Sequence, residues 1–239
     1  MHIQFIGTSD GYPTAERYCS CTVVTVKGCH YVIDAGISLY SMLLKYKMNP
    51  SDTRAIFITH MHGDHTNGLI EYANMMTWGS GKNLNTRIFM PTKIGKIALQ
   101  NMIQAQDFGR EIPIDVFSEG PIYEDENVKV TAFRTRHNDN SFGFLIEGEG
   151  KRVYFTGDMS STISEMPEFL KTEKTDAVIC ESAHNKLYEC TDILNSLNTD
   201  KIIINHIAQK HSLDDFEKAK PVIRNNFILA FDGMEISDL

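Results

Sequence analysis

Apolar and β-branched residues recur in short runs along the N-terminal half of this 239-residue chain and predict a series of strands. The runs are separated by glycine, proline and polar residues, and between them lie stretches with helical periodicity. The expected strands cover residues 2–6, 21–26, 30–33, 54–59 and 87–90, and the expected helices cover residues 39–48, 64–76 and 93–105.

The C-terminal half repeats this pattern loosely. Strands are expected at residues 128–134, 142–146, 152–155, 177–180, 201–204 and 227–231, and helices at 166–172, 192–197 and 213–224. Ser212 and Asp215 have the spacing of a capping box for the last helix. In each half strands come first and then alternate with helices, which predicts an α/β (α+β) fold with two packed sheets and helices outside. No linker-like composition interrupts the chain, so we expect one domain, 1–239.

Composition and charge narrow the function classes. The chain is 42% hydrophobic and 23% charged, with a net charge of −8, so it lacks the basic excess of a broad nucleic-acid-binding surface. A phosphate substrate is still allowed, because bound divalent cations would dominate the local field. The N-terminus does not resemble a secretory leader, and no apolar run approaches a membrane span. With five cysteines, an odd number, we expect reduced thiols and a cytoplasmic location.

A cluster of metal-binding residue types follows the apolar run 55–58. It reads His60-Met61-His62-Gly63-Asp64-His65. Side chains two apart in an extended segment project to one side, so His60 and His62 can bind one metal ion together. Asp64 and His65 follow the turn at Gly63 and point elsewhere, which suggests a second ion. Imidazole and carboxylate ligands without thiolate suit zinc, iron or manganese.

Four residues cannot complete two metal sites, so further ligands must come from later in the chain. His137, Asp158 and His206 each stand where a predicted strand ends, as His60 does. Strand ends gathered on one edge of stacked sheets make a site. Each of these residues alone would more often be structural, but as a set they are candidate ligands.

These segments together resemble the metallo-β-lactamase superfamily, and within it the branch of ribonuclease Z and the cyclic phosphodiesterases of phosphonate breakdown. The resemblance covers almost the whole chain. The segments that carry it are 5–17, similar to the N-terminal segment of ribonuclease Z; Thr59 to His65, the first metal motif; Phe155-Thr156-Gly157-Asp158, the bridging-aspartate motif; and 231–236, similar to the C-terminus of the cyclic phosphodiesterases.

The resemblance implies a four-layer αββα sandwich and a binuclear metal site. It implies that one ion is held by His60, His62 and His137, the other by Asp64, His65 and His206, and that Asp158 bridges them. The expected cofactors are two divalent metal ions, zinc in the first place, with manganese or iron as alternatives. True β-lactamases of the main subclass carry a cysteine where Asp158 stands, which argues against antibiotic hydrolysis.

The expected chemistry is hydrolysis. Two ions about 3.5–4 Å apart share a hydroxide and neutralise a phosphodiester under attack. Asp64 can orient the nucleophile while serving as a ligand. The leaving alkoxide needs a proton, and the resemblance implies a non-ligand acid histidine between the bridging aspartate and the last ligand. His184 is the histidine in that interval, with Glu181 able to polarise it and His211 as an alternative donor.

Arg17 and Lys210 are candidate phosphate contacts, although loop charges are more often simply solvated.

Three functions are compatible with these residues. The first is a phosphodiesterase acting on a small or single-stranded, nucleotide-like phosphodiester. The second is ribonuclease Z, the endonuclease that processes the 3′ end of tRNA. That enzyme has a long tRNA-gripping arm between its third histidine motif and the bridging aspartate, whereas the interval here is 158 − 137 = 21 residues, enough only for a hairpin. The third is a non-catalytic sensory metal-binding module. Without that arm and without a basic surface, RNA is not the favoured partner. We expect no association with a membrane, and a homodimer is possible.

Overall fold

Two mixed β-sheets form the centre of the protein in the computed structural model, which describes residues 1–78, 84–106, 111–209 and 211–239. In the described residues each sheet has seven strands. The first sheet has the order β14 (Glu235–Ile236), β1 (His2–Gly7), β2 (Cys21–Val26), β3 (Cys29–Ile33), β4 (Thr53–Phe57), β5 (Arg87–Met90) and β6 (Ile114–Val116). The second has the order β13 (Asn226–Leu229), β12 (Thr199–Asn205), β11 (Thr175–Glu181), β10 (Lys151–Phe155), β9 (Phe142–Gly148), β8 (Lys129–Arg134) and β7 (Gly120–Glu124).

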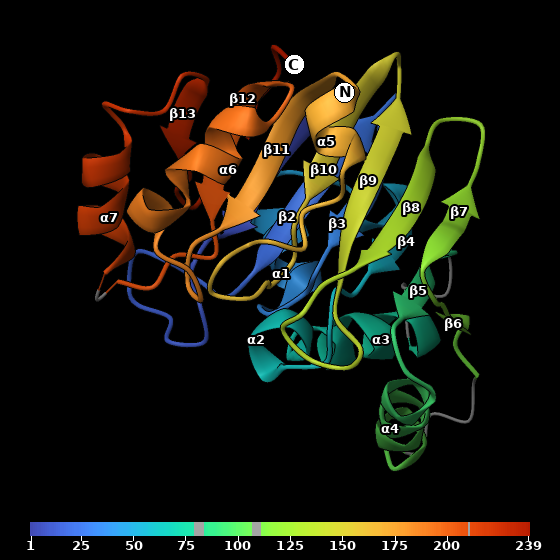
Figure 1. The fold of residues 1–239 in the computed structure, drawn as a ribbon. Helices are drawn as coiled ribbons and strands as arrows, with labels where there is room; N and C mark the ends of the chain where they lie inside the picture. The colour runs from blue at the N-terminus through green and yellow to red at the C-terminus, as the bar shows by residue number, and fades with distance from the viewer. Residues whose placement is uncertain (79–83, 107–110, 210) are drawn as a thin grey trace.

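Helices cover the outer face of each sheet, which gives the expected αββα layers (Figure 1). The first sheet is covered by helices from the N-terminal half: α1 (Leu39–Lys45), α3 (Leu69–Thr77) and α4 (Lys93–Gln104), with the short α2 (Gly63–Thr66) and the 3₁₀ turn η1 (Pro50–Asp52) beside them. The second is covered by α5 (Phe169–Thr172), α6 (Thr191–Ser196) and α7 (Ser212–Ala219), with the 3₁₀ turn η3 (Leu187–Cys190).

Alternation along the strands builds three apolar layers. In β4, Ala55 and Phe57 pack between the sheets while Ile56 packs under the helices of the first sheet. In β12, Ile203 faces the other sheet and Ile202 faces the helices. Both faces of these strands are buried, which explains why they read as continuous apolar runs rather than alternating ones.

Several sequence-based expectations on elements need correction. The helix expected over residues 64–76 is two helices, because Gly68 lies against the preceding loop and donates its N–H to the carbonyl of Ala35 at 2.7 Å. The capping box expected at Ser212 is absent: that hydroxyl donates to the carbonyl of Ser182 at 2.8 Å, and His211 is the N-cap residue. Strands β6, β7 and β14 were not expected from the sequence.

Strand direction positions the site. β3, β4 and β5 run parallel, and so do β10, β11 and β12. The carboxyl ends of parallel strands meet at one edge of a sheet. Asp34 and His60 follow β3 and β4, while Asp158 and His206 follow β10 and β12, and the two edges face each other across the sandwich.

Among the described residues, none of the helices has the length and apolarity needed to cross a bilayer.

Candidate metal centre

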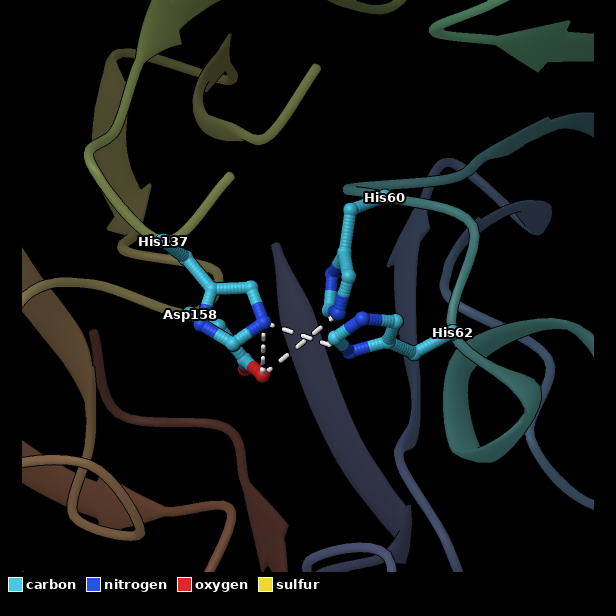
Figure 2. A group of neighbouring side chains, drawn as sticks. All are labelled: His60, His62, His137 and Asp158. Carbon is cyan, nitrogen blue, oxygen red and sulfur yellow. Dashed lines mark hydrogen bonds and ion pairs between the residues drawn. The ribbon is translucent and has the colours of Figure 1, made fainter. Parts of the chain in front are cut away.

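The first group of candidate ligands consists of His60, His62, His137 and Asp158, whose ligand atoms all lie within 4.8 Å of one another. Figure 2 shows the four side chains converging from three separate loops. The Nε2 atom of His137 lies 3.2 Å from Nδ1 of His62 and 3.8 Å from Oδ2 of Asp158. His60 directs its Nε2 atom to the same carboxylate oxygen at 3.6 Å.

The second group consists of Asp64, His65 and His206 and meets the first at Asp158. Oδ2 of Asp158 lies 3.5 Å from Nε2 of His65 and 3.3 Å from Nε2 of His206. The Oδ2 atom of Asp64 lies 3.4 Å and 3.8 Å from the same two nitrogens. The seven residues expected as ligands are thus brought together, and in the two sets that were expected. That they bind metal stays a proposal.

The cluster has the spacing and the unsatisfied atoms of a metal site. Ligand atoms about 2.0–2.1 Å from a tetrahedral zinc ion are separated by about 3.3 Å, close to the observed spacings of 3.2–3.8 Å. In the described part of the chain, Nε2 of His60, Nε2 of His65 and Oδ1 of Asp158 are buried without a hydrogen-bond partner. Such buried polar atoms are costly unless something satisfies them, and a cation would.

Electrostatics favours the metal-binding form of His60 and of Asp158. Burial, with the neighbouring His65, lowers the pKa of His60 to about 2, so this imidazole is neutral and keeps its lone pair. Burial acts to raise the pKa of Asp158, but the imidazoles of His206 and His65 outweigh it and hold that pKa well below its usual range. The shared residue is therefore a carboxylate.

Partners on the far side of the rings fix their orientation. Nδ1 of His65 is 2.7 Å from the buried carboxylate of Asp34, and Nδ1 of His206 is 2.7 Å from the hydroxyl of Ser20. Thr59 donates its hydroxyl to Asp34 and lies 3.2 Å from Nδ1 of His60. These contacts direct the Nε2 atoms toward the cluster, as outer partners of metal-binding histidines do. Sequence reasoning missed Asp34, although it follows a strand end as the ligands do.

The backbone at this edge is unusual. Asp34 and His206 adopt left-handed conformations, with φ of 59° and 49°. Non-glycine residues in this region carry strain that the surroundings must hold, and such residues gather at functional sites. Gly157, with φ of 58°, precedes Asp158, and a Cβ atom there would lie 2.3 Å from the carbonyl oxygen of Phe142. Only glycine fits the turn that presents Asp158.

His184 lies at the edge of the cluster, with its side chain 36% exposed. Its Nδ1 atom is 3.4 Å from Oε1 of Glu181 and 3.7 Å from Oδ2 of Asp158. Glu181 also accepts the backbone N–H groups of Ala183 and His184, which fixes the carboxylate beneath the ring. The interaction with Glu181 raises the pKa of His184. Asp158, His184 and His206 also form a third group with ligand-like spacing. The position of His184 therefore suits either a proton donor or a metal ligand.

The other sequence candidates lie apart from this cluster. His211 lines a neighbouring cavity and belongs to none of the ligand-like groups among the described residues. The guanidinium of Arg17 donates to the hydroxyl of Thr8 and the carbonyl of Ala230 at 2.6 and 2.8 Å, so it braces the N-terminal loop. Lys210 lies outside the described residues.

Comparison with known proteins places the chain among metallo-β-lactamase-fold proteins. A family model described as anti-Pycsar protein Apyc1 matches residues 1–222. Ribonuclease Z of Exiguobacterium sp. is 28% identical over 152 residues, which cover 63% of this chain and 50% of that protein. Ribonuclease Z of Pseudomonas putida (strain GB-1) is 32% identical over 151 residues, covering 61% of this chain and 46% of that protein. The chain thus spans about half the length of the curated relatives it matches.

Solved structures confirm the fold that the sequence predicted. The metallo-β-lactamase-fold protein YhfI from Bacillus subtilis superposes with a TM-score of 0.78 at 18% identity, over 98% of each chain. The short form of human tRNase Z gives 0.77 at 20% identity, over 99% of each chain. A diphosphatase of the PhnP family gives 0.73 at 14% identity, over 100% of this chain and 98% of the other. The sequence relatives named above, at 28% and 32% identity, are ribonuclease Z proteins, which agrees with the predicted ribonuclease Z-like branch.

Proposed function

The chain belongs to the anti-Pycsar protein Apyc1 family, and for this member we propose a metal-dependent phosphodiesterase activity toward a small, nucleotide-like phosphodiester. The curated relatives are named ribonuclease Z, which is a hydrolase. This agrees with the metal-dependent hydrolase that the sequence predicted. The observation that carries the proposal is the meeting of two ligand-like groups at one oxygen of Asp158. A pair of ions sharing one carboxylate is an arrangement suited to phosphoryl chemistry.

In this proposal His60, His62 and His137 would hold one divalent ion, zinc in the first place, and Asp64, His65 and His206 would hold the other, with Asp158 available to both groups. When bound, the ions supply a nucleophile from water at neutral pH and neutralise charge on the phosphate. The protein keeps the imidazoles aimed through Asp34 and Ser20. Asp64, at the rim of the cluster, orients the attacking group.

His184 supplies the proton that the leaving oxygen needs. It stands within 3.7 Å of Asp158, is open to solvent on one side and is held by the carboxylate of Glu181. A protonated imidazole at this place can donate as the ester bond breaks, and an alkoxide is a poor leaving group without that donation.

Ribonuclease Z activity is the second candidate, and the curated relatives favour it. Two features count against it. The interval between His137 and Asp158 holds only the hairpin of β9 and β10, joined by a tight turn, where ribonuclease Z is expected to carry its arm. The net charge of −8 also provides no basic excess for gripping tRNA.

A screen of zinc- and manganese-reconstituted protein tests the proposal. The substrates are bis(p-nitrophenyl) phosphate, cyclic nucleotides, ribose cyclic phosphates and a tRNA precursor, and the quantity compared is kcat/KM. We expect turnover of the small diesters and much poorer cleavage of the precursor. Efficient trimming of the precursor would favour ribonuclease Z, and absence of any turnover by metal-loaded protein would favour the sensory module.

We propose that residues 1–239 act as one catalytic domain in the cytoplasm, where its five free cysteines stay reduced. A homodimer remains an expectation, which sedimentation equilibrium would test.

A further inference from the structure

A cavity of about 420 Å³ opens beside the metal centre. Two loops from opposite ends of the chain form it, one carrying Asp10, Tyr12, Pro13 and Thr14 and the other carrying Ala208, Gln209 and His211, with Ala183 between them. Its size is within the range of pockets that hold small ligands. The mechanism described above uses none of these residues.

The cavity shares its wall with the candidate metal centre. Ala183 directly precedes His184, and Ala208 follows His206 by two residues. Gly11 lies against the second ligand group, because a Cβ atom built on it would be 3.6 Å from Oδ2 of Asp64. A molecule whose phosphate sat at the metal centre could therefore extend a substituent into this cavity.

The N-terminal loop that carries Tyr12 is held in place by the segment that follows β12. Ser9 bridges to Ile207, whose carbonyl accepts the N–H of Asp10 at 3.3 Å. The N–H of Tyr12 donates to Asp10 Oδ1 at 3.0 Å, and its carbonyl accepts the hydroxyl of Ser9 at 3.1 Å.

The amide of Gln209 closes the loop by donating to Thr14 at 3.1 Å. The backbone of Tyr12 is thus fixed from both sides, while its ring is 83% exposed.

A fixed backbone with an exposed aromatic ring at a cavity mouth is suited to stacking. Tyrosine offers a large flat surface at little cost in side-chain entropy, and a planar heterocycle is attracted to it whatever its hydrogen-bonding pattern. The small side chains of Ala183 and Ala208 leave room for such a ring, and Asp10 and Gln209 add polar atoms at its edge.

We propose that this cavity is a specificity subsite, in which Tyr12 stacks on a planar ring attached to the substrate's phosphodiester. The inference rests on the proposed function, because that function places the phosphate next to the cavity. Tyr12 then determines which substrates bind well, without taking part in bond cleavage.

Binding of two product-like probes tests the subsite without turnover. Calorimetry on the zinc-loaded protein compares adenosine monophosphate with ribose 5-phosphate, which differ by the ring. We expect the wild type to bind the nucleotide more tightly. Tyr12→Ala should weaken the nucleotide about 5- to 100-fold, the usual contribution of one stacked base, and leave ribose 5-phosphate unchanged. Tyr12→Phe should retain the preference.

Tyr188 provides the matched control. It is 52% exposed and lies outside the lining of this cavity, so Tyr188→Ala should bind both probes as the wild type does. Equal binding of the two probes by the wild type, or equal weakening of both by Tyr12→Ala, would overturn the subsite. Turnover of bis(p-nitrophenyl) phosphate is measured in parallel. Loss of that activity with an intact ring preference would refute the phosphodiesterase and leave the subsite standing.

Discussion

At the scale of single residues, the site depends on groups that lie outside the candidate ligand set. Asp34 is 31 positions from His65 along the chain, and Ser20 is 186 positions from His206, yet each lies 2.7 Å from the ring it orients. The gathering of the seven candidate ligands could be predicted, because their spacing and their place at strand ends carry the signal. Their outer partners could not, because only the folded chain brings them into contact.

Replacing Asp34 tests this outer layer. Asn tolerates the left-handed conformation found there, so Asp34→Asn removes the charge behind His65 and keeps the shape. We expect zinc affinity to fall about 10- to 100-fold, the usual loss for such partners, as measured by competition with a chromophoric chelator. Asp176→Asn, whose carboxylate pairs with Lys151 away from the site, should bind zinc as the wild type does. Unchanged affinity in Asp34→Asn would show that Asp34 does not support the ligand.

Substituting His184 separates acid from ligand. His184→Ala should keep its metal and slow diesters with alkyl or ribose leaving groups about 10²–10⁴-fold, the usual contribution of a positioned acid. It should slow p-nitrophenyl diesters far less, because nitrophenolate leaves without a proton. His62→Ala should lose metal and both activities together. Metal loss in His184→Ala would instead identify His184 as a ligand, in line with its spacing to Asp158 and His206.

At the scale of elements, strands buried on both faces were predicted well and edge elements were not. β4 and β12 stand out in the sequence because each contains three consecutive apolar residues, 55–57 in β4 and 202–204 in β12. β6 and β14 have three and two residues, and β7 is half exposed, so none has a hydrophobic pattern to recognise. The division of helix 64–76 at Gly68 depends on a contact with Ala35 that periodicity does not contain.

A carboxylate ties the edge strand β7 to the rest of the sandwich. Asp125 accepts hydrogen bonds from the hydroxyls of Tyr31 in β3 and Tyr123 in β7, at 2.7 and 2.8 Å. Burial acts to raise the pKa of Asp125, but these bonds and two backbone N–H groups outweigh it, and the pKa is lowered. A lowered folded-state pKa stabilises the fold above the unfolded value, about 4, and that contribution disappears as pH falls through the folded-state pKa.

The pH dependence of unfolding tests this link. Asp125→Asn should be less stable than the wild type between pH 5 and 7, and the difference in unfolding free energy should shrink as the pH is lowered below about 4. Urea titrations in the presence of a chelator measure it without a contribution from metal. A difference that grows on acidification would show that Asp125 is not stabilised as the ionised form.

At the scale of the whole molecule, the two halves of the chain contribute to one centre from facing sheet edges. His60, His62, Asp64 and His65 come from the first sheet's side, and His137, Asp158 and His206 from the second. The fold class and this division could be read from the sequence, since each half showed the same order of strands and helices. The cavity at Tyr12 could not, because it forms between loops nearly two hundred residues apart.

The number of metal ions per chain tests the central claim most directly. The protein is stripped with chelator, reconstituted with excess zinc, freed of unbound metal and analysed for metal and protein content. Seven candidate ligands that meet at Asp158 predict two ions per chain in the wild type, and fewer in Asp158→Ala, which lacks the shared carboxylate. A wild-type stoichiometry that stays at zero or one after reconstitution would contradict the binuclear centre.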